Sequence, residues 1–132
     1  MIWREGFWQV HVYAIRGFER FRRKERISKK ALVEAIDRAI SGLIDAELGG
    51  GLVKQRVARP GQGRRGGYRA IIAYQAGKRA VFLFGFAKNA KDNIAPDDLA
   101  HWRLIGAELL AATEKAIEQA IADDELMEVL DE

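Results

Sequence analysis

Cysteine is absent from this chain of 132 residues, and proline occurs only twice. The absence of cysteine excludes disulfides, thiolate zinc sites and cysteine nucleophiles, and it is typical of cytoplasmic proteins. No apolar run approaches the roughly 18 residues that a membrane-spanning helix needs, and residues 1–10 (MIWREGFWQV) lack the long apolar core of a signal peptide. We therefore expect a cytoplasmic protein with no membrane span.

Residues that commonly carry catalysis are also scarce. Histidine occurs only as His11 and His101, and serine only as Ser28 and Ser41. Ser28 is expected to cap a helix, and neither serine has the histidine and acid motif of a serine hydrolase. The chain has no HExxH motif, no cysteine–histidine cluster and no acidic loop with metal-ligand spacing. We therefore expect neither a metal site nor a cofactor.

Acidic residues are missing from the central stretch 49–91, which holds ten Lys or Arg residues. The net charge is only +3, but residues 1–91 contain 20 basic and 7 acidic side chains, whereas residues 92–132 contain 2 basic and 12 acidic ones. A basic body suits a polyanionic partner, whose binding would depend on salt. Solubility and pairing within the chain are alternative reasons for the asymmetry.

Length and composition predict one domain over residues 1–132, because 48% of the residues are hydrophobic and 31% are charged. Residues 1–8 show no clear period and are a possible extension that precedes the domain. Residues 123–132 (DDELMEVLDE) are an acidic tail, which either frays or lies against the basic body and masks it.

Apolar periodicity predicts an α+β fold with four strands and three helices. The expected strands are 10–15, 52–58, 68–76 and 79–86. The first expected helix is 16–26, the second runs from Ser28 to the triple glycine 49–51, and the third runs from Pro96 to Ala120. The last two strands form a hairpin, whereas residues 58–67 (ARPGQGRRGG) are expected to form a loop. Alternation places Phe82, Phe84 and Phe86 on one face as core, rather than as a stacking surface for bases.

The cations of the basic body fall on several of these elements. The two-residue period of a strand places Lys54 and Arg56 on one face, and Arg69 follows in the next strand. Further cations lie in the expected loop (Arg59, Arg64 and Arg65), after the last strand (Lys88 and Lys91), and on a helical stripe that either tracks phosphates or faces solvent (Arg20 and Arg23).

Arginine, lysine and tyrosine can cleave RNA without a metal. The 2′-hydroxyl of RNA is a built-in nucleophile, so a protein must hold it in line, stabilise charge on the phosphate oxygens and assist proton transfer. The acid-free stretch lacks the carboxylate pair of a glycosidase or of a two-metal nuclease. Cation-assisted chemistry on a phosphodiester is therefore the catalysis that this composition favours.

Two segments resemble a known family. Residues 42–74 (GLIDAELGGGLVKQRVARPGQGRRGGYRAIIAY) and 82–94 (FLFGFAKNAKDNI) are similar to the RelE/ParE toxin superfamily, in particular to the HigB-like RelE branch of bacterial type II toxin–antitoxin modules. The resemblance covers about residues 16–110. It implies a RelE-like α+β fold, in which N-terminal helices and a C-terminal helix pack on a small, mostly antiparallel sheet.

The resemblance also implies a function. Such toxins typically inhibit translation by cleaving mRNA in the ribosomal A site with basic residues, and a cognate antitoxin, for instance one with a helix-turn-helix domain, neutralises them. The positions that match catalytic cations are Lys54, Arg56, Arg69 and Lys88; cations expected to bind the RNA are Arg59, Arg64, Arg65, Lys91, Arg20 and Arg23.

The chain departs from the family pattern at two positions. Asn89 stands where RelE has an arginine, and Ile94 or Ala95 stands where RelE has a catalytic tyrosine. Tyr68 and Tyr74 are the candidates to replace that tyrosine. Two alternatives to an endoribonuclease stay open: a toxin of the same fold that inhibits a protein target such as DNA gyrase, and a non-catalytic RNA-binding module.

Overall fold

The computed structural model describes residues 2–4, 7–59, 63–88 and 94–129, without the side chains of residues 2–4, 7–9 and 63–66. Within these residues the elements are β1 (Ile2–Arg4), β2 (Phe7–Ile15), α1 (Arg16–Lys24), α2 (Lys29–Ile40), β3 (Ala46–Gly49), β4 (Leu52–Arg59), β5 (Gly63–Gln75), β6 (Arg79–Ala87), α3 (Pro96–Ala111), α4 (Glu114–Ala122) and β7 (Leu126–Glu128).

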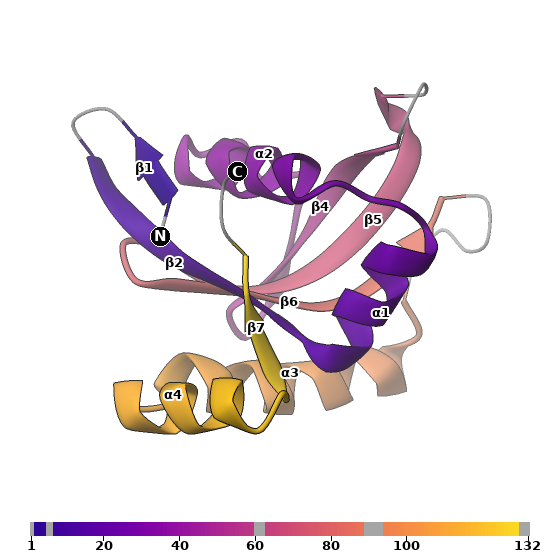
Figure 1. Ribbon diagram of the computed structural model, residues 1–132. Helices are drawn as coiled ribbons and strands as arrows, with labels where there is room; N and C mark the ends of the chain where they lie inside the picture. Colours follow the sequence, from indigo (N-terminus) through magenta and orange to yellow (C-terminus); the bar gives the residue numbers. More distant parts are fainter. Residues whose placement is uncertain (1, 5–6, 60–62, 89–93, 130–132) are drawn as a thin grey trace.

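The seven described strands form a sheet in the order β1-β2-β6-β5-β4-β3, and β7 pairs with another part of β2. The β2–β6 pair is parallel, and the other described pairs are antiparallel. Figure 1 shows α1 and α2 on one side of this sheet and α3 and α4 on the other. The predicted α+β fold with a mostly antiparallel sheet is therefore confirmed.

Each face of the sheet packs a core of its own, because successive strand residues point to opposite faces. The core under α1 and α2, here the first core, includes Phe18, Leu32, Ile36, Ile72 and Phe82. The core under α3 and α4, here the second core, includes Leu52, Ile71, Leu83, Phe86 and Ile117. Two strands of the site described below, β4 and β5, contribute to both cores.

The expectation that the second helix reaches the triple glycine is wrong. α2 begins after Ser28, whose Oγ accepts the Ala31 N–H at 3.0 Å, but it ends at Ile40. Gly42 has a φ of +85°, which allows the left-handed turn that closes many helices. The following residues form β3, so the three glycines 49–51, all with positive φ, make the tight turn of a β3–β4 hairpin.

The expectation of a loop over residues 58–67 is wrong at both of its ends. β4 continues to Arg59 and β5 starts at Gly63, which is the register partner of Arg59. Residues 60–62 lie outside the described part of the chain. Glycine lacks a side chain but keeps both backbone hydrogen-bonding groups, so the glycine-rich sequence still pairs as a strand.

The alternation predicted for β6 is interrupted. The pairing of β5 with β6 shifts register in the middle of the strands, so Phe82 faces the first core, where its ring centroid lies 4.9 Å from that of Phe18. Phe86 lies in the second core and Phe84 stacks on Trp102 of α3, with centroids 5.8 Å apart. The three rings are packed in the interior as expected, but they do not share one face.

The single helix expected over residues 96–120 is divided in two. α3 ends at Ala111, and Thr113 caps α4 by accepting the Ala116 N–H at 3.1 Å. The guanidinium of Arg79, which is 1% exposed, donates to the carbonyls of Leu109 at 2.6 Å and Ala112 at 2.9 Å. Arg79 thus satisfies carbonyls at the end of α3 that would otherwise lack partners.

The described part of the acidic tail does not fray. Leu126–Glu128 forms β7 along β2, and Leu126 and Val129 are each 2% exposed. Nε of Arg16 also donates to the carbonyl of Asp124 at 2.9 Å. Residues 123–129 therefore lie against β2 and the start of α1.

Gly85 allows α1 to approach β6 closely. A Cβ at this position would lie 2.4 Å from Cε2 of Phe21, so Gly85→Ala is expected to lower the free energy of unfolding by about 1–3 kcal/mol through overpacking. Urea unfolding measures the change. Gly17→Ala is the matched control because a Cβ there meets nothing within 4 Å, and a helical alanine should stabilise slightly; equal stability of the two variants would contradict the packing argument.

Candidate functional site

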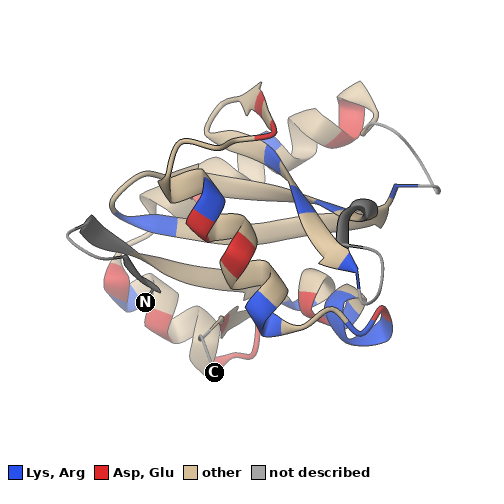
Figure 2. Cartoon of the chain, turned by 90° about the horizontal axis from the view of Figure 1, so that it is seen from above, with Lys and Arg blue, Asp and Glu red and all other residues tan. Residues whose placement is uncertain are grey.

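Three predicted cations come together on β4 and β5. The Cα of Arg56 is the register partner of Arg69, and that of Lys54 is the partner of Ile71. All three cations lie on the face of the second core, because Leu52 on β4 and Ile71 on β5 belong to that core and are separated from them by even numbers of residues. We call Lys54, Arg56 and Arg69 the cation cluster. Figure 2 colours the Lys and Arg positions along the ribbon blue.

The electrostatics of the cation cluster are unfavourable without a ligand. Like charges directly opposite each other on adjacent strands destabilise a sheet, and Arg56 and Arg69 are such a pair. The pKa of Arg69 is lowered, first by burial and then by the charge of Arg56, while Asp45 acts in the opposite direction. Arginine stays protonated in proteins, so this surface holds concentrated positive charge that an anion would stabilise.

Arg56 is held through its main chain. Oδ2 of Asp45 accepts the Arg56 N–H at 2.7 Å, and Nη2 of Arg38 donates to the Arg56 carbonyl. Nη1 of Arg38 also donates to Asp45 at 3.0 Å. Buried Gln55 supports this arrangement, because its Oε1 accepts the Asp45 N–H at 2.7 Å.

Sequence reasoning missed these supporting residues. Arg38 and Asp45 are seven positions apart, and Arg56 is eleven positions beyond Asp45. A side chain that binds the backbone of a distant strand leaves no periodic signal. The buried glutamine in an otherwise apolar strand face was the one available hint, since buried polar groups need partners.

The remaining predicted site residues differ in where they lie relative to the cluster. The guanidinium carbon of Arg59 lies 5.5 Å from the ring centroid of Tyr68, which belongs to the first core. Lys88 is exposed just after β6, and its N–H donates to the carbonyl of Gly67 at 3.3 Å, two residues before Arg69. Arg20 and Arg23 are exposed on α1, and Arg23 pairs with Glu19 at 3.3 Å. The side chains of Arg64 and Arg65, and all of Lys91, lie outside the described part.

Neither of the two candidate tyrosines, Tyr68 and Tyr74, lies on the sheet face of the cation cluster. Tyr68 is 2% exposed, and its hydroxyl donates to Oε1 of Glu25 at 3.0 Å. Burial raises the pKa of Tyr68 most, and the hydrogen bond with Glu25 and its negative charge raise it further. Tyr74 packs against the same first core. Both tyrosines are thus on the sheet face opposite to Arg69.

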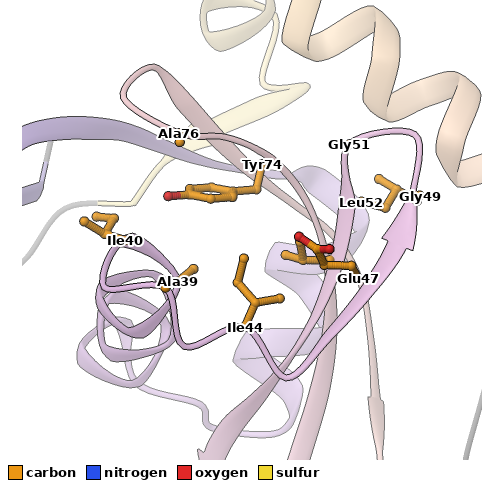
Figure 3. A pocket seen from close by; sticks show the side chains of 11 residues that line it. Ala39, Ile40, Ile44, Glu47, Gly49, Gly51, Leu52, Tyr74 and Ala76 are labelled. Carbon is orange, nitrogen blue, oxygen red and sulfur yellow. The ribbon is translucent and has the colours of Figure 1, made fainter.

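A separate pocket opens between the end of α2, the β3–β4 hairpin and Tyr74 (Figure 3). It has a volume of about 610 Å³. Its described lining is mostly apolar and includes Ile40 and Ile44, and Glu47 is the one charged residue in that lining. The pocket can accept an apolar group, but it gathers no set of catalytic side chains.

Other kinds of site find little support in the described residues. No group of three or more His, Cys, Asp or Glu residues in that part of the chain is arranged to hold a metal ion. None of the described helices is both long and apolar enough to cross a membrane. The cation cluster is therefore the best candidate for a functional site, and its chemistry suits a phosphate.

Asp45 should make stability depend on pH in acid. Burial alone raises the pKa of its carboxyl, but the hydrogen bonds from the Arg56 N–H and from Arg38, together with their charges, outweigh burial and lower it. A carboxyl with a lowered folded-state pKa stabilises the fold above its unfolded pKa of about 3.9, and this contribution is lost as pH falls below that value. We expect the stability of the wild type to fall more steeply than that of Asp45→Asn below pH of about 4, as measured by urea unfolding. Parallel pH profiles would contradict the assignment.

A comparison with protein families finds a match over most of the chain. The model described as the RelE toxin of the RelE/RelB toxin–antitoxin system matches residues 10–129. The matched region contains the cation cluster, the residues that support it and both cores. A search of curated proteins found no match.

Proposed function

We propose that this chain, which belongs to the RelE toxin family, inhibits translation by cleaving mRNA on the ribosome. As a member of that family it is the toxin of a toxin–antitoxin system, and its partner is a cognate antitoxin. The observation that supports this proposal most is the direct opposition of Arg56 and Arg69 on adjacent strands. Two guanidinium groups in that arrangement can bind the non-bridging oxygens of a phosphodiester.

The proposed reaction uses the 2′-hydroxyl of the RNA as the nucleophile. Its oxygen attacks the adjacent phosphorus and the bond to the 5′-oxygen breaks, which leaves a 2′,3′-cyclic phosphate and a 5′-hydroxyl. Arg56 and Arg69 stabilise the charge that grows on the phosphate oxygens. Lys54, which is half-buried beside them, assists the proton transfers.

The outer cations would hold the RNA rather than react with it. Lys88 and Lys91 are assigned to the RNA backbone near the cut. The cations assigned to more distant RNA are Arg59, Arg64, Arg65, Arg20 and Arg23. Their spread over β4, β5 and α1 fits a partner much larger than one nucleotide, such as the ribosome with its mRNA. The cytoplasmic location and the HigB-like branch remain predictions of the same proposal.

Primer extension on a defined mRNA in a bacterial translation extract tests the function. The wild type is compared with Arg56→Ala, and Lys115→Ala on α4 is the control for loss of one exposed charge. We expect cuts with wild type and Lys115→Ala, few cuts with Arg56→Ala, and none when ribosomes are omitted. Intact mRNA with translation unaffected would refute the nuclease and direct attention to a protein target such as DNA gyrase. RNA binding without cuts would instead support a non-catalytic RNA-binding module.

A further inference from the structure

The main chain of Arg56 lies where strand pairing on one side of β4 has stopped. β3 pairs with β4 only over Ala46–Gly49, opposite residues 52–54, so it offers no backbone group to Arg56. Backbone N–H and C=O groups that lack a strand partner at a sheet edge normally form hydrogen bonds with water, which does not fix their position. At Arg56 two side chains replace the missing strand: Asp45 accepts the N–H at 2.7 Å, and Arg38 donates to the carbonyl.

These two side chains are themselves fixed. Nε of Arg38 donates to Oε2 of Glu34 at 2.6 Å, and its Nη1 donates to Asp45 at 3.0 Å. The Arg38 side chain is 11% exposed and that of Asp45 is 24% exposed, so water competes little for these charge-assisted bonds. The backbone of Asp45 is bound to Gln55, which also donates to the Ala35 carbonyl of α2 at 2.9 Å.

The bonding leaves the guanidinium of Arg56 available. Oδ2 of Asp45 accepts hydrogen bonds from the Arg56 N–H and from Nη1 of Arg38. The Arg56 side chain makes no hydrogen bond to another described residue. A carboxylate paired with that side chain would have competed with an anionic ligand. Asp45 instead fixes the position of Arg56, and its negative charge offsets part of the repulsion between Arg56 and Arg69.

We propose that Arg38 and Asp45 are positioning residues for the cation cluster: they hold both main-chain groups of Arg56 and thereby keep its guanidinium directly opposite Arg69. This inference rests on the proposed RNA cleavage, because positioning matters only for a reaction that needs two cations on one phosphate. Misplacement of a charge-stabilising group by about 1 Å can cost a factor of about 100 in rate. The effect should therefore fall on the rate at saturation rather than on RNA binding.

Single-turnover cleavage of ribosome-bound mRNA tests the inference in Asp45→Ala and Arg38→Met. We expect the maximal rate to fall about 10- to 100-fold while the half-saturating concentration changes less than about 3-fold, since the remaining cations still bind the RNA. Asp45→Asn should keep most of the rate because its amide oxygen can accept the Arg56 N–H. Glu114→Gln is the control: it removes an ion pair with Arg79, which lies far from Arg56, and should not change the rate. Full activity of Asp45→Ala would overturn the proposal, and so would equal loss in Glu114→Gln.

Hydrogen exchange of the Arg56 amide, followed by NMR, examines the same contacts without any cleavage. Exchange should be at least about 10-fold faster in Asp45→Ala than in the wild type, and unchanged in Glu114→Gln. An unaltered exchange rate in Asp45→Ala would refute the claim that Asp45 holds the main chain of Arg56. A wild type that cuts no RNA would overturn the proposed function and the catalytic part of this inference, whereas faster exchange would still establish that Asp45 holds Arg56.

Discussion

Arg69→Ala is expected to lower the rate of mRNA cleavage by about 100- to 1000-fold, which is the usual cost of removing one preorganised group that stabilises transition-state charge. Arg69 lies opposite Arg56 and next to Phe86 in the sheet, so a phosphate held there meets two guanidinium groups from one direction. Single-turnover cleavage in a translation extract measures the effect. Arg69→Lys should recover little of the rate, because an ammonium lacks the planar fork of donors.

The fold should survive this substitution. Within the described residues, the Arg69 side chain makes one long hydrogen bond, to the carbonyl of Tyr68 at 3.3 Å. Its removal relieves repulsion with Arg56. The free energy of unfolding of Arg69→Ala is therefore expected to equal or slightly exceed that of the wild type. A fully active Arg69→Ala protein would remove the catalytic assignment, and an unfolded one would show that Arg69 has a structural role instead.

Arg79→Ala should produce the largest loss of stability. The substitution removes the donors that buried Arg79 offers to the carbonyls of Leu109 and Ala112 at the junction of α3 and α4. It also leaves a cavity, since Arg79 is among the largest fully buried side chains. We expect the free energy of unfolding to fall by about 3–5 kcal/mol, as when one member of a buried charged network is deleted.

Urea unfolding measures this loss, and Glu114→Gln provides the comparison. The Glu114 side chain is 72% exposed in its ion pair with Arg79, and exposed pairs contribute only about 0–1 kcal/mol. A small effect of Arg79→Ala, similar to that of Glu114→Gln, would mean that the carbonyls at the end of α3 find other partners. A large effect in both would contradict the view that the backbone carbonyls are the important acceptors.

Local patterns in the sequence were enough to locate much of the fold. The alternation of residues 52–58 places Lys54 and Arg56 on one face of a strand, and the turn at Gly77 places Arg69 in a hairpin strand that pairs with β6, as observed. Hydrophobic periodicity works here because each strand face and each helix stripe packs against one core. The two-residue period gives the shared face of Lys54 and Arg56, whereas the position of Arg69 opposite Arg56 follows from the pairing of β4 with β5.

Features that depend on contacts between distant segments were not predictable. The register shift in β6 and the break between α3 and α4 arise from the pairing with β5 and from the carbonyls that Arg79 binds. Gly42 is a local signal for the early end of α2, but the triple glycine 49–51 is an equally good signal for the end of a helix farther along the chain. The support of Arg56 by Asp45 and Arg38 had no sequence signature at all.

The central claim is that the cation cluster promotes attack by the RNA's own 2′-hydroxyl, and the ends of the cut RNA test it most directly. Fragments made by the wild type in a translation extract are isolated, and their termini are identified by mass spectrometry and by labelling of 5′-hydroxyl groups. The account predicts 2′,3′-cyclic phosphates and 5′-hydroxyls, absent from the Arg69→Ala reaction. Fragments with 5′-phosphates and 3′-hydroxyls would contradict it, because they require water as the nucleophile.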